Sequence, residues 1–180
     1  MNTILNELTN ELNNLKWSKS NNKKYGRQSL NVARTDQEEP DRFYFITGLI
    51  RDWSARSHNN FTPSLRISKA SKLPKHQRVI ELATKYMALY NPSFQYTSIQ
   101  FSKCMLTPRH VDKNNTGNSI IVGVGDYTGG ALNIHHGEEV EPINIWRTPY
   151  MFDAGNTYHS TGEFSGDRIT ITWFSVKDFT

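Results

Sequence analysis

Three side chains in the second half of the sequence have the types and the spacing to bind one metal ion. His110 and Asp112 are separated by a single residue, and side chains two positions apart on an extended chain project from the same face. A second imidazole, His159, lies between strand-like runs at residues 149–152 and 169–174. Two imidazoles and one carboxylate that leave coordination positions open are typical of non-haem Fe(II) oxygenases. The pattern predicts an iron site at these three residues, although a His-x-Asp pair alone is more often part of a surface loop.

An arginine follows the second histidine at a short distance. Arg168 lies nine residues after His159 in the run Arg-Ile-Thr-Ile-Thr-Trp-Phe, which alternates polar and apolar residues. The alternation places Arg168, Thr170 and Thr172 on one face of a strand. An arginine on an inward face needs an anionic partner, because an unpaired buried charge is costly. A dicarboxylate would supply one, since a guanidinium binds a carboxylate through two hydrogen bonds, and Thr170 would add a hydroxyl donor.

Together these residues resemble the motif of the Fe(II)/2-oxoglutarate-dependent dioxygenase superfamily. That motif is His-x-Asp, a distal His, and Arg-x-Ser/Thr soon afterwards; it falls here on His110, Asp112, His159, Arg168 and Thr170. The resemblance extends over residues 96–175. The segment 110–115, with the glycine-rich turn 125–130, is also similar to small oxygenases related to the TET/JBP methylpyrimidine hydroxylases.

The resemblance implies a fold, a set of cofactors and a reaction. The fold would be mostly β with flanking helices, around a double-stranded β-helix core of the jelly-roll or cupin type. The cofactors would be Fe(2+), 2-oxoglutarate and O2, with ascorbate as a candidate reductant. Members of the superfamily couple oxidative decarboxylation of 2-oxoglutarate to hydroxylation of a C–H bond. His110, Asp112 and His159 would be the catalytic metal ligands, and Arg168 and Thr170 would bind 2-oxoglutarate.

Four polar residues around the His-x-Asp pair are candidate substrate contacts. Arg109 and Lys113 flank the pair and could reach anionic groups of a substrate, while a solvent-facing role is equally open for both. Asn114 and Asn115 follow it and could contact substrate or hold the loop that carries the ligands. Asparagine is also common in turns for local reasons.

The other histidines are not expected to bind the catalytic ion. His135 and His136 are adjacent, so they would point to opposite faces of a strand, and the residues that follow indicate a solvated turn. His58 and His76 have no potential ligand nearby in the sequence and are predicted to lie on the surface.

Three classes of function stay open. The first is hydroxylation of a methylated pyrimidine base in nucleic acid, and the second is hydroxylation of a protein side chain of the prolyl type or of a small molecule. The spacing between His159 and Arg168 is also similar to that of prolyl hydroxylases, so it does not distinguish the first two. The third is a non-catalytic cupin-type binding protein, which would not need Arg168 at this offset.

Length and composition favour a single domain over residues 1–180, with helices and loops in residues 1–92 and the catalytic core in residues 93–180. One cysteine, Cys104, excludes an internal disulfide and is consistent with a reducing compartment. No run approaches the roughly 20 apolar residues that cross a bilayer, and the first 17 residues lack the features of a signal peptide. We therefore expect a soluble intracellular protein, cytoplasmic or nuclear, without a membrane partner.

Charge is distributed unevenly along the chain. Residues 1–78 contain 14 Lys and Arg against 7 Asp and Glu, whereas residues 79–180 contain 7 against 10. A basic N-terminal half favours DNA or RNA as a partner, and a lysine-rich solvated surface is the alternative. Residues 18–40 are predicted to form a loop, and Lys23, Lys24 and Arg27 would contact anionic groups if that loop recognises substrate.

Hydrophobic periodicity predicts the elements that position the site. Two amphipathic helices, expected to pack against the barrel, are predicted at residues 3–17 and 74–90. Strands are predicted at 43–50, 94–105, 119–125, 131–134, 142–147, 148–152 and 169–174. In the strand at 94–105, one face carries Ser98, Gln100 and Ser102, which could line the pocket.

Overall fold

The computed structural model describes residues 1–18, 32–33, 43–52 and 64–178. Its helices are α1 (Asn2–Asn14) and α2 (Gln77–Tyr90), with the short 3-10 helices η3 (Lys69–Lys72) and η4 (Pro74–His76) before α2. The strands up to the glycine-rich turn are β1 (Val32–Ala33), β2 (Phe43–Arg51), β3 (Leu65–Ile67), β4 (Ser98–Lys103), β5 (Met105–Leu106) and β6 (Asn115–Val124). The remaining strands are β7 (Tyr127–Gly129), β8 (Leu132–His136), β9 (Glu139–Ile143), β10 (Tyr150–Phe152), β11 (His159–Thr161), β12 (Phe164–Gly166) and β13 (Ile169–Val176).

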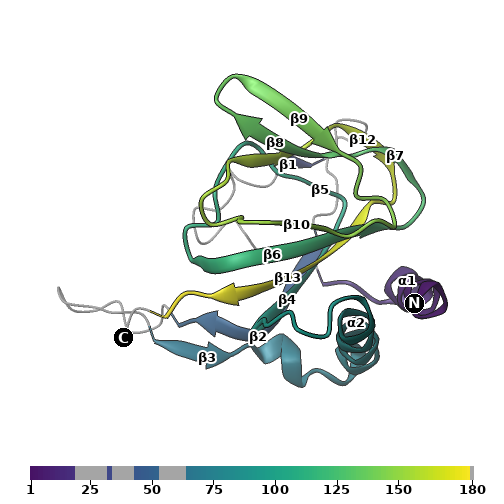
Figure 1. Ribbon diagram of the computed structural model, residues 1–180. Coiled ribbons are helices and arrows are strands. Elements are labelled where there is room, and N and C mark those ends of the chain that lie inside the picture. Colours follow the sequence, from purple (N-terminus) through teal and green to yellow (C-terminus); the bar gives the residue numbers. More distant parts are fainter. Residues whose placement is uncertain (19–31, 34–42, 53–63, 179–180) are drawn as a thin grey trace.

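The strands form a large sheet and several smaller ones. The major sheet has the order β10-β6-β13-β4-β2-β3, and the minor sheet has the order β11-β8-β9. Strands β12 and β7 pair with each other, as do β1 and β5. Figure 1 shows β8 and β9 on one side of β6 and β13, and the helices α1 and α2 on the other side. This arrangement of two facing antiparallel sheets with flanking helices is the predicted fold.

The two faces of the major sheet differ because its strands alternate. Ile171 and Trp173 of β13 are fully buried in one core with the helices. Thr170 and Thr172, which alternate with these two residues, point to the opposite face, toward the minor sheet. There Thr170 pairs with Ser102 of β4 on one side and with Gly123 of β6 on the other. The polar face predicted for β4 therefore continues across β13.

Both helices cover the apolar face, as their periodicity predicts. Leu5, Leu8 and Leu12 recur at spacings of three and four in α1, and all three are buried. The buried residues of α2 are Val79, Leu82, Ala83, Tyr86 and Met87. These side chains belong to the same core as Trp173 and Phe101 of the sheet. Neither of the two α-helices in the described part of the chain has the length and apolar character needed to cross a membrane.

Several predicted boundaries are wrong in detail. The strand expected at residues 94–105 begins only at Ser98, and it is interrupted at Cys104, whose φ of 52° lies in the left-handed region. The strand expected at residues 142–147 is instead β9, which pairs with β8 across a turn at Gly137. Most of the predicted loop, with Lys23, Lys24 and Arg27, and also His58 lie outside the described residues.

His76 is not the surface residue that the sequence predicts. It is only 4% exposed, and its ring stacks on Phe45 of β2 with centroids 3.9 Å apart. Its Nδ1 lies 2.9 Å from the carbonyl oxygen of Ala70. His76 therefore joins the start of α2 to the sheet as a core residue, and it is not part of a metal site.

Candidate metal centre

His110 and His159 are held together by the backbone. His110 lies in the connection between β5 and β6 and forms an isolated antiparallel bridge with His159, the first residue of β11. The two residues exchange N–H···O bonds of 3.0 and 2.9 Å. This pairing places the two imidazole rings side by side, with centroids 4.2 Å apart.

Asp112 completes the group from an irregular segment rather than from a strand. Its N–H donates to the carbonyl oxygen of Ala154 at 2.8 Å, which fixes the backbone two residues beyond His110. One carboxylate oxygen lies 3.4 Å from Nε2 of His110, and the other lies 3.9 Å from Nε2 of His159. The predicted pairing of His110 with Asp112 is therefore present, although regular strand geometry does not produce it.

The distances fit a shared metal ion. The three ligand atoms all lie within 4.8 Å of one another. Two atoms bonded to one ion at about 2.0–2.2 Å lie no more than roughly 4.4 Å apart, so small movements of the side chains would bring all three to bonding distance. Among the described residues, no other group of three or more His, Cys, Asp or Glu side chains meets in this way.

Hydrogen bonds fix which nitrogen of each ring faces the centre. Nδ1 of His110 lies 2.8 Å from the carbonyl oxygen of Pro108, and Nδ1 of His159 lies 2.8 Å from that of Thr157. A carbonyl oxygen can only accept, so each Nδ1–H donates and each ring turns its Nε2 toward the space shared with Asp112, where the lone pair of a neutral ring could bind a cation. Metal-binding histidines are commonly oriented by such a second hydrogen bond.

The electrostatics of the two rings differ. Burial lowers the pKa of His159, and nearby His110 lowers it further. Burial also lowers the pKa of His110, but the hydrogen bond and the negative charge of Asp112 outweigh this effect, so the net shift of that pKa is upward. The Asp112 carboxylate thus favours a positive charge at this position. A divalent cation would supply that charge and would compete with a proton for His110.

Asn115, predicted as a substrate contact, lies behind the carboxylate of Asp112. Its Nδ2 donates to Asp112 Oδ2 at 3.3 Å, and its backbone N–H donates to the Asp112 carbonyl at 2.8 Å. As the first residue of β6 it links the ligand segment to the major sheet. This position agrees with the alternative in which an asparagine holds the ligand loop.

The other candidate substrate contacts lie on the surface beside the site. Lys113 and Asn114 are exposed. Arg109 is also exposed, and its guanidinium lies over the ring of Tyr158, 4.9 Å from the centroid. Arg109 and Tyr158 each directly precede one of the two histidines, so their contact lies beside the candidate metal centre. Their contact with a substrate stays a prediction.

Arg168 lies within the protein and directly precedes β13. It is 4% exposed, and its Nε donates to the carbonyl oxygen of Gly130 at 3.0 Å. Its guanidinium lies between the rings of Tyr127 and Phe164, at 5.8 and 5.6 Å from their centroids. Burial lowers the pKa of Arg168 to about 10, so the group is still cationic at neutral pH.

This cation fits an anionic ligand. Arg168 forms no ion pair with any carboxylate in the described part of the chain, and a buried charge without a partner is costly. Thr170, two residues on, lies on the polar face of β13 and is also buried. A carboxylate bound to Arg168 and Thr170 would supply the missing counter-charge.

The sequence did not identify Tyr127 as a site residue. Its hydroxyl is buried and has no hydrogen-bond partner in the structure, and its ring lies beside Arg168. It belongs to the glycine-rich turn, which predicted a hairpin and no chemistry. A large aromatic residue between glycines is the only sequence signal for it.

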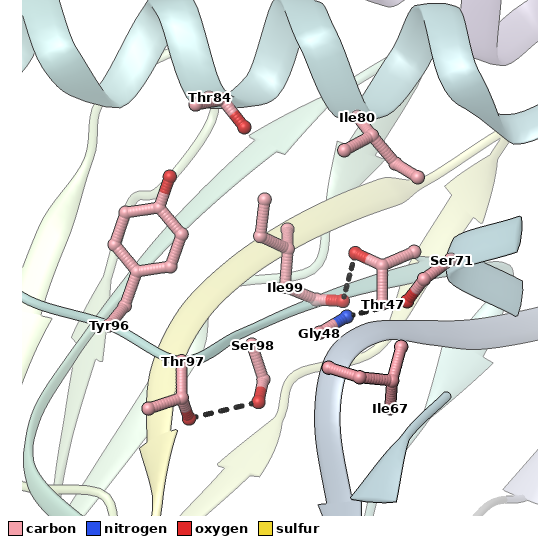
Figure 2. Close-up of a pocket in the computed structure, with 10 residues that line it drawn as sticks. All are labelled: Thr47, Gly48, Ile67, Ser71, Ile80, Thr84, Tyr96, Thr97, Ser98 and Ile99. Atoms are coloured by element: carbon pink, nitrogen blue, oxygen red, sulfur yellow. Dashed lines mark hydrogen bonds between the residues drawn. The ribbon is translucent and has the colours of Figure 1, made fainter. Parts of the chain in front are cut away.

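Two further features were considered as sites. His135 and His136, which were not expected to bind the ion, contact Ser160 at 2.9 Å and Glu141 at 3.1 Å. A cavity of about 250 Å³ lies between α2 and strands β2–β4 (Figure 2). The hydroxyls of Thr47 and Ser71 in this cavity already form hydrogen bonds with backbone groups. These two side chains are therefore not left without a partner that a ligand would have to supply.

Comparison with known proteins gives structural matches only. No protein-family model matches the sequence, and no curated protein matches it. An oxidoreductase of the 2OG-Fe(II) oxygenase family from Burkholderia pseudomallei is 11% identical, with a TM-score of 0.50 over 80% of this chain and 70% of that one. NgTET1 in complex with 5mC DNA is 16% identical, with a TM-score of 0.50 over 78% of this chain and 62% of that one.

A third match is a prolyl hydroxylase from Trichoplax adhaerens, in complex with a peptide of the hypoxia inducible factor oxygen degradation domain. It is 12% identical, with a TM-score of 0.51 over 95% of this chain and 76% of that one. At these identities the matches establish a shared fold, the double-stranded β-helix of 2-oxoglutarate oxygenase structures.

Proposed function

We propose that this protein is an Fe(II)- and 2-oxoglutarate-dependent dioxygenase that hydroxylates a C–H bond. The observation that carries this proposal is the convergence of two imidazole nitrogens and one carboxylate within 4.8 Å. A buried arginine without a carboxylate partner lies in the same fold, as a keto diacid cosubstrate requires.

Each residue of the site has a task in this reaction. His110, Asp112 and His159 would hold Fe(II) on one side and leave the remaining positions open for cosubstrate and O2. The hydrogen bonds to the two Nδ1 atoms and to Asp112 keep these ligands in place. When bound, the iron would couple O2 to this oxidation, in which one oxygen atom enters succinate as 2-oxoglutarate loses CO2 and the other hydroxylates a substrate C–H bond.

Arg168 and Thr170 would bind the carboxylate of 2-oxoglutarate that lies farther from the metal. The guanidinium can donate two parallel hydrogen bonds to a carboxylate. Since Gly130 holds Nε and two rings flank the group, its position is fixed before binding. The bound diacid would then present its keto acid end to the metal in one register.

Release of succinate tests the proposal. Purified protein with Fe(II), 2-oxoglutarate and ascorbate should release succinate, and a true substrate should increase the rate. Asp112→Ala removes one of three ligands and should abolish this activity while leaving the fold intact, because Asp112 is 40% exposed and contributes little to the core. The exposed Asp126→Ala variant is the matched control. Full activity of Asp112→Ala would contradict the assignment.

For the substrate, we propose a methylated pyrimidine base in nucleic acid. Two observations support this class. The similar structure NgTET1 is a complex with 5mC DNA, and residues 1–78 have an excess of basic over acidic residues. Half of these 14 basic residues lie in segments 19–31, 34–42 and 53–63, outside the described structure. Oligonucleotides with and without 5-methylcytosine should therefore differ in how much they increase succinate release.

A protein side chain is the second candidate substrate. The similar Trichoplax adhaerens prolyl hydroxylase is a complex with a peptide, and the match covers 95% of this chain. Proline-containing peptides and free amino acids belong in the same succinate assay. An increase with peptides alone would replace the nucleic-acid proposal without changing the assignment of the metal and cosubstrate residues.

A further inference from the structure

The hydroxyl of Tyr127 is one of the few buried side-chain polar atoms in the described structure without a hydrogen-bond partner. A buried hydroxyl left unpaired destabilises a fold by roughly 1–3 kcal/mol, so such groups usually have a partner. A phenylalanine would fill the same space without this cost. The hydroxyl therefore needs an explanation other than packing.

The position of the hydroxyl is set by a glycine. Tyr127 Oη occupies the space where the side chain of Gly123 would be, so a methyl group at residue 123 would overlap it. Gly123 pairs with Thr170 in the ladder between β6 and β13, and paired residues share a face with Cα atoms about 4.5–5.5 Å apart. The hydroxyl of Tyr127 thus lies next to Thr170 on the polar face of the sheet.

Arg168 lies at the same place. Its guanidinium carbon is 5.8 Å from the centroid of the Tyr127 ring. The guanidinium can only donate a hydrogen bond to the Tyr127 oxygen, so the phenolic O–H still has no acceptor among the described residues. Arg168 in turn has no carboxylate partner in the described part of the chain. One carboxylate offers two oxygens and about four acceptor sites, which is enough for both residues and for the hydroxyl of Thr170.

We propose that Tyr127 is a third donor, with Arg168 and Thr170, to the distal carboxylate of 2-oxoglutarate, and that Gly123 provides the space that positions it. This inference rests on the proposed function and adds two residues to its cosubstrate site. Tyr127 is a binding residue in this scheme, and Gly123 is a positioning residue that acts through it.

The protonation state of Tyr127 agrees with a donor role. Burial raises the pKa of this phenol, and the positive charge of Arg168 lowers it by less, so the net shift is upward. The phenol therefore keeps its proton at neutral pH. An incoming carboxylate would find an O–H donor beside a cation.

Binding of 2-oxoglutarate to the full chain loaded with Mn(II) in place of Fe(II) tests the inference by isothermal titration calorimetry. Tyr127→Phe should raise the Kd for 2-oxoglutarate at least about tenfold, because a hydrogen bond to a charged group is lost. In metal-free protein the same variant should unfold at the same temperature as wild type or higher, because it removes an unpaired hydroxyl. Tyr96→Phe, in the separate cavity of Figure 2, should change neither the Kd nor the melting temperature.

A double-mutant cycle tests Gly123. Gly123→Ala should weaken 2-oxoglutarate binding in the wild-type background, because the hydroxyl must move. In the Tyr127→Phe background the same change should add little, since the hydroxyl is already absent. In turnover assays Tyr127→Phe should raise the KM for 2-oxoglutarate much more than it changes kcat.

The outcomes separate the inference from the proposed function. A Tyr127→Phe Kd within twofold of wild type, with weakened binding by an Arg168 variant, would overturn the role of Tyr127 and leave the proposed function standing. Additive effects of the two substitutions in the cycle would overturn the role of Gly123. If wild-type protein with metal does not bind 2-oxoglutarate, the proposed function fails, and this inference fails with it.

Discussion

Arg168 is the residue in which structure and proposed chemistry are most closely connected. Its cationic group is removed from water, lies between two aromatic rings and pairs with no carboxylate of the described chain. The lowered pKa reflects the energetic cost of this burial. If Arg168 served only to fill space, a methionine of similar volume would do so without a buried charge. An anionic ligand would account for the charge.

Replacing Arg168 should therefore affect 2-oxoglutarate far more than it affects the fold. Arg168→Met keeps most of the volume and removes the charge. The apparent KM for 2-oxoglutarate should rise by orders of magnitude, on the scale of about 2–5 kcal/mol for losing one partner of a buried charge pair. Arg147→Met, whose guanidinium bonds to Asn6 elsewhere on the protein, is the control. An unchanged KM in the Arg168 variant would refute its role.

At the scale of elements, α1 and α2 support the sheet that carries the site. Trp173 of β13 is fully buried against Tyr86 of α2, with ring centroids 5.9 Å apart. On the opposite face of the same strand lies Thr170. The register of β13 is thus fixed by packing on one face, and this fixes where Thr170, a proposed cosubstrate residue, lies on the other face.

Two leucines of α2 give a matched test of this packing. Leu82 is 2% exposed and Leu89 is 55% exposed. Leu82→Ala should lower the free energy of unfolding by about 2–5 kcal/mol, because it leaves a cavity in the core, whereas Leu89→Ala should change it by no more than about 0.5 kcal/mol. Urea denaturation followed by circular dichroism measures both. Equal effects would mean that α2 does not pack on the sheet as described.

His76 should make stability depend on pH at the junction of α2 and β2. Burial lowers its pKa, and this exceeds the upward effect of its hydrogen bond to Ala70. The unfolded chain then binds a proton more readily than the folded protein, so stability is complete above about pH 6.5 and is lost as the pH falls below that value. His76→Phe, which can keep the stacking on Phe45, should show a smaller loss of melting temperature between neutral and mildly acidic pH. An identical pH dependence in the variant would contradict this origin.

Considered as a whole molecule, the proposed metal centre joins parts of the chain that are far apart in the sequence. His159 belongs to the minor sheet, while His110 and Asp112 lie in the connection that leads into the major sheet. In the described structure, the backbone pairs of His110 with His159 and of Asp112 with Ala154, together with the contact between the two imidazole rings, link these segments. An ion bound to all three side chains would add a direct link between them.

Metal binding should consequently stabilise the fold. A ligand that binds only the folded state stabilises it by about 2.7 kcal/mol at a concentration of 100 Kd. Adding Mn(II) to metal-free protein should raise the melting temperature, and a chelator should reverse the effect. Asp112→Ala should show little or no increase, whereas Asp126→Ala should behave like wild type. A rise of equal size in Asp112→Ala would place the ion elsewhere.

The sequence alone predicted both α-helices and the longer strands of the major sheet, with their faces, whereas several short strands such as β11 and β12 were not predicted. The spacing of leucines in residues 2–14 and the alternation after Arg168 depend on the geometry of a helix and a strand, which neighbouring residues define without the rest of the chain. The motif that resembles the dioxygenase superfamily proposed three candidate metal ligands, Arg168 and Thr170, and the structure places the three candidate ligand atoms within 4.8 Å of one another. Boundaries were less accurate, as at Cys104, because a single left-handed residue ends a strand without any change in hydrophobicity.

Only the tertiary structure decided which distant side chains meet. The bridge between His110 and His159, the burial of His76 and the position of Tyr127 over Gly123 all follow from pairing between strands far apart in the sequence. Such pairing is set by the register of a whole sheet and by packing against the helices. Local pattern carries no information about it, since the same alternation is compatible with several registers. The residues of the site could therefore be predicted individually, whereas their common centre and the unpaired groups beside Arg168 could not.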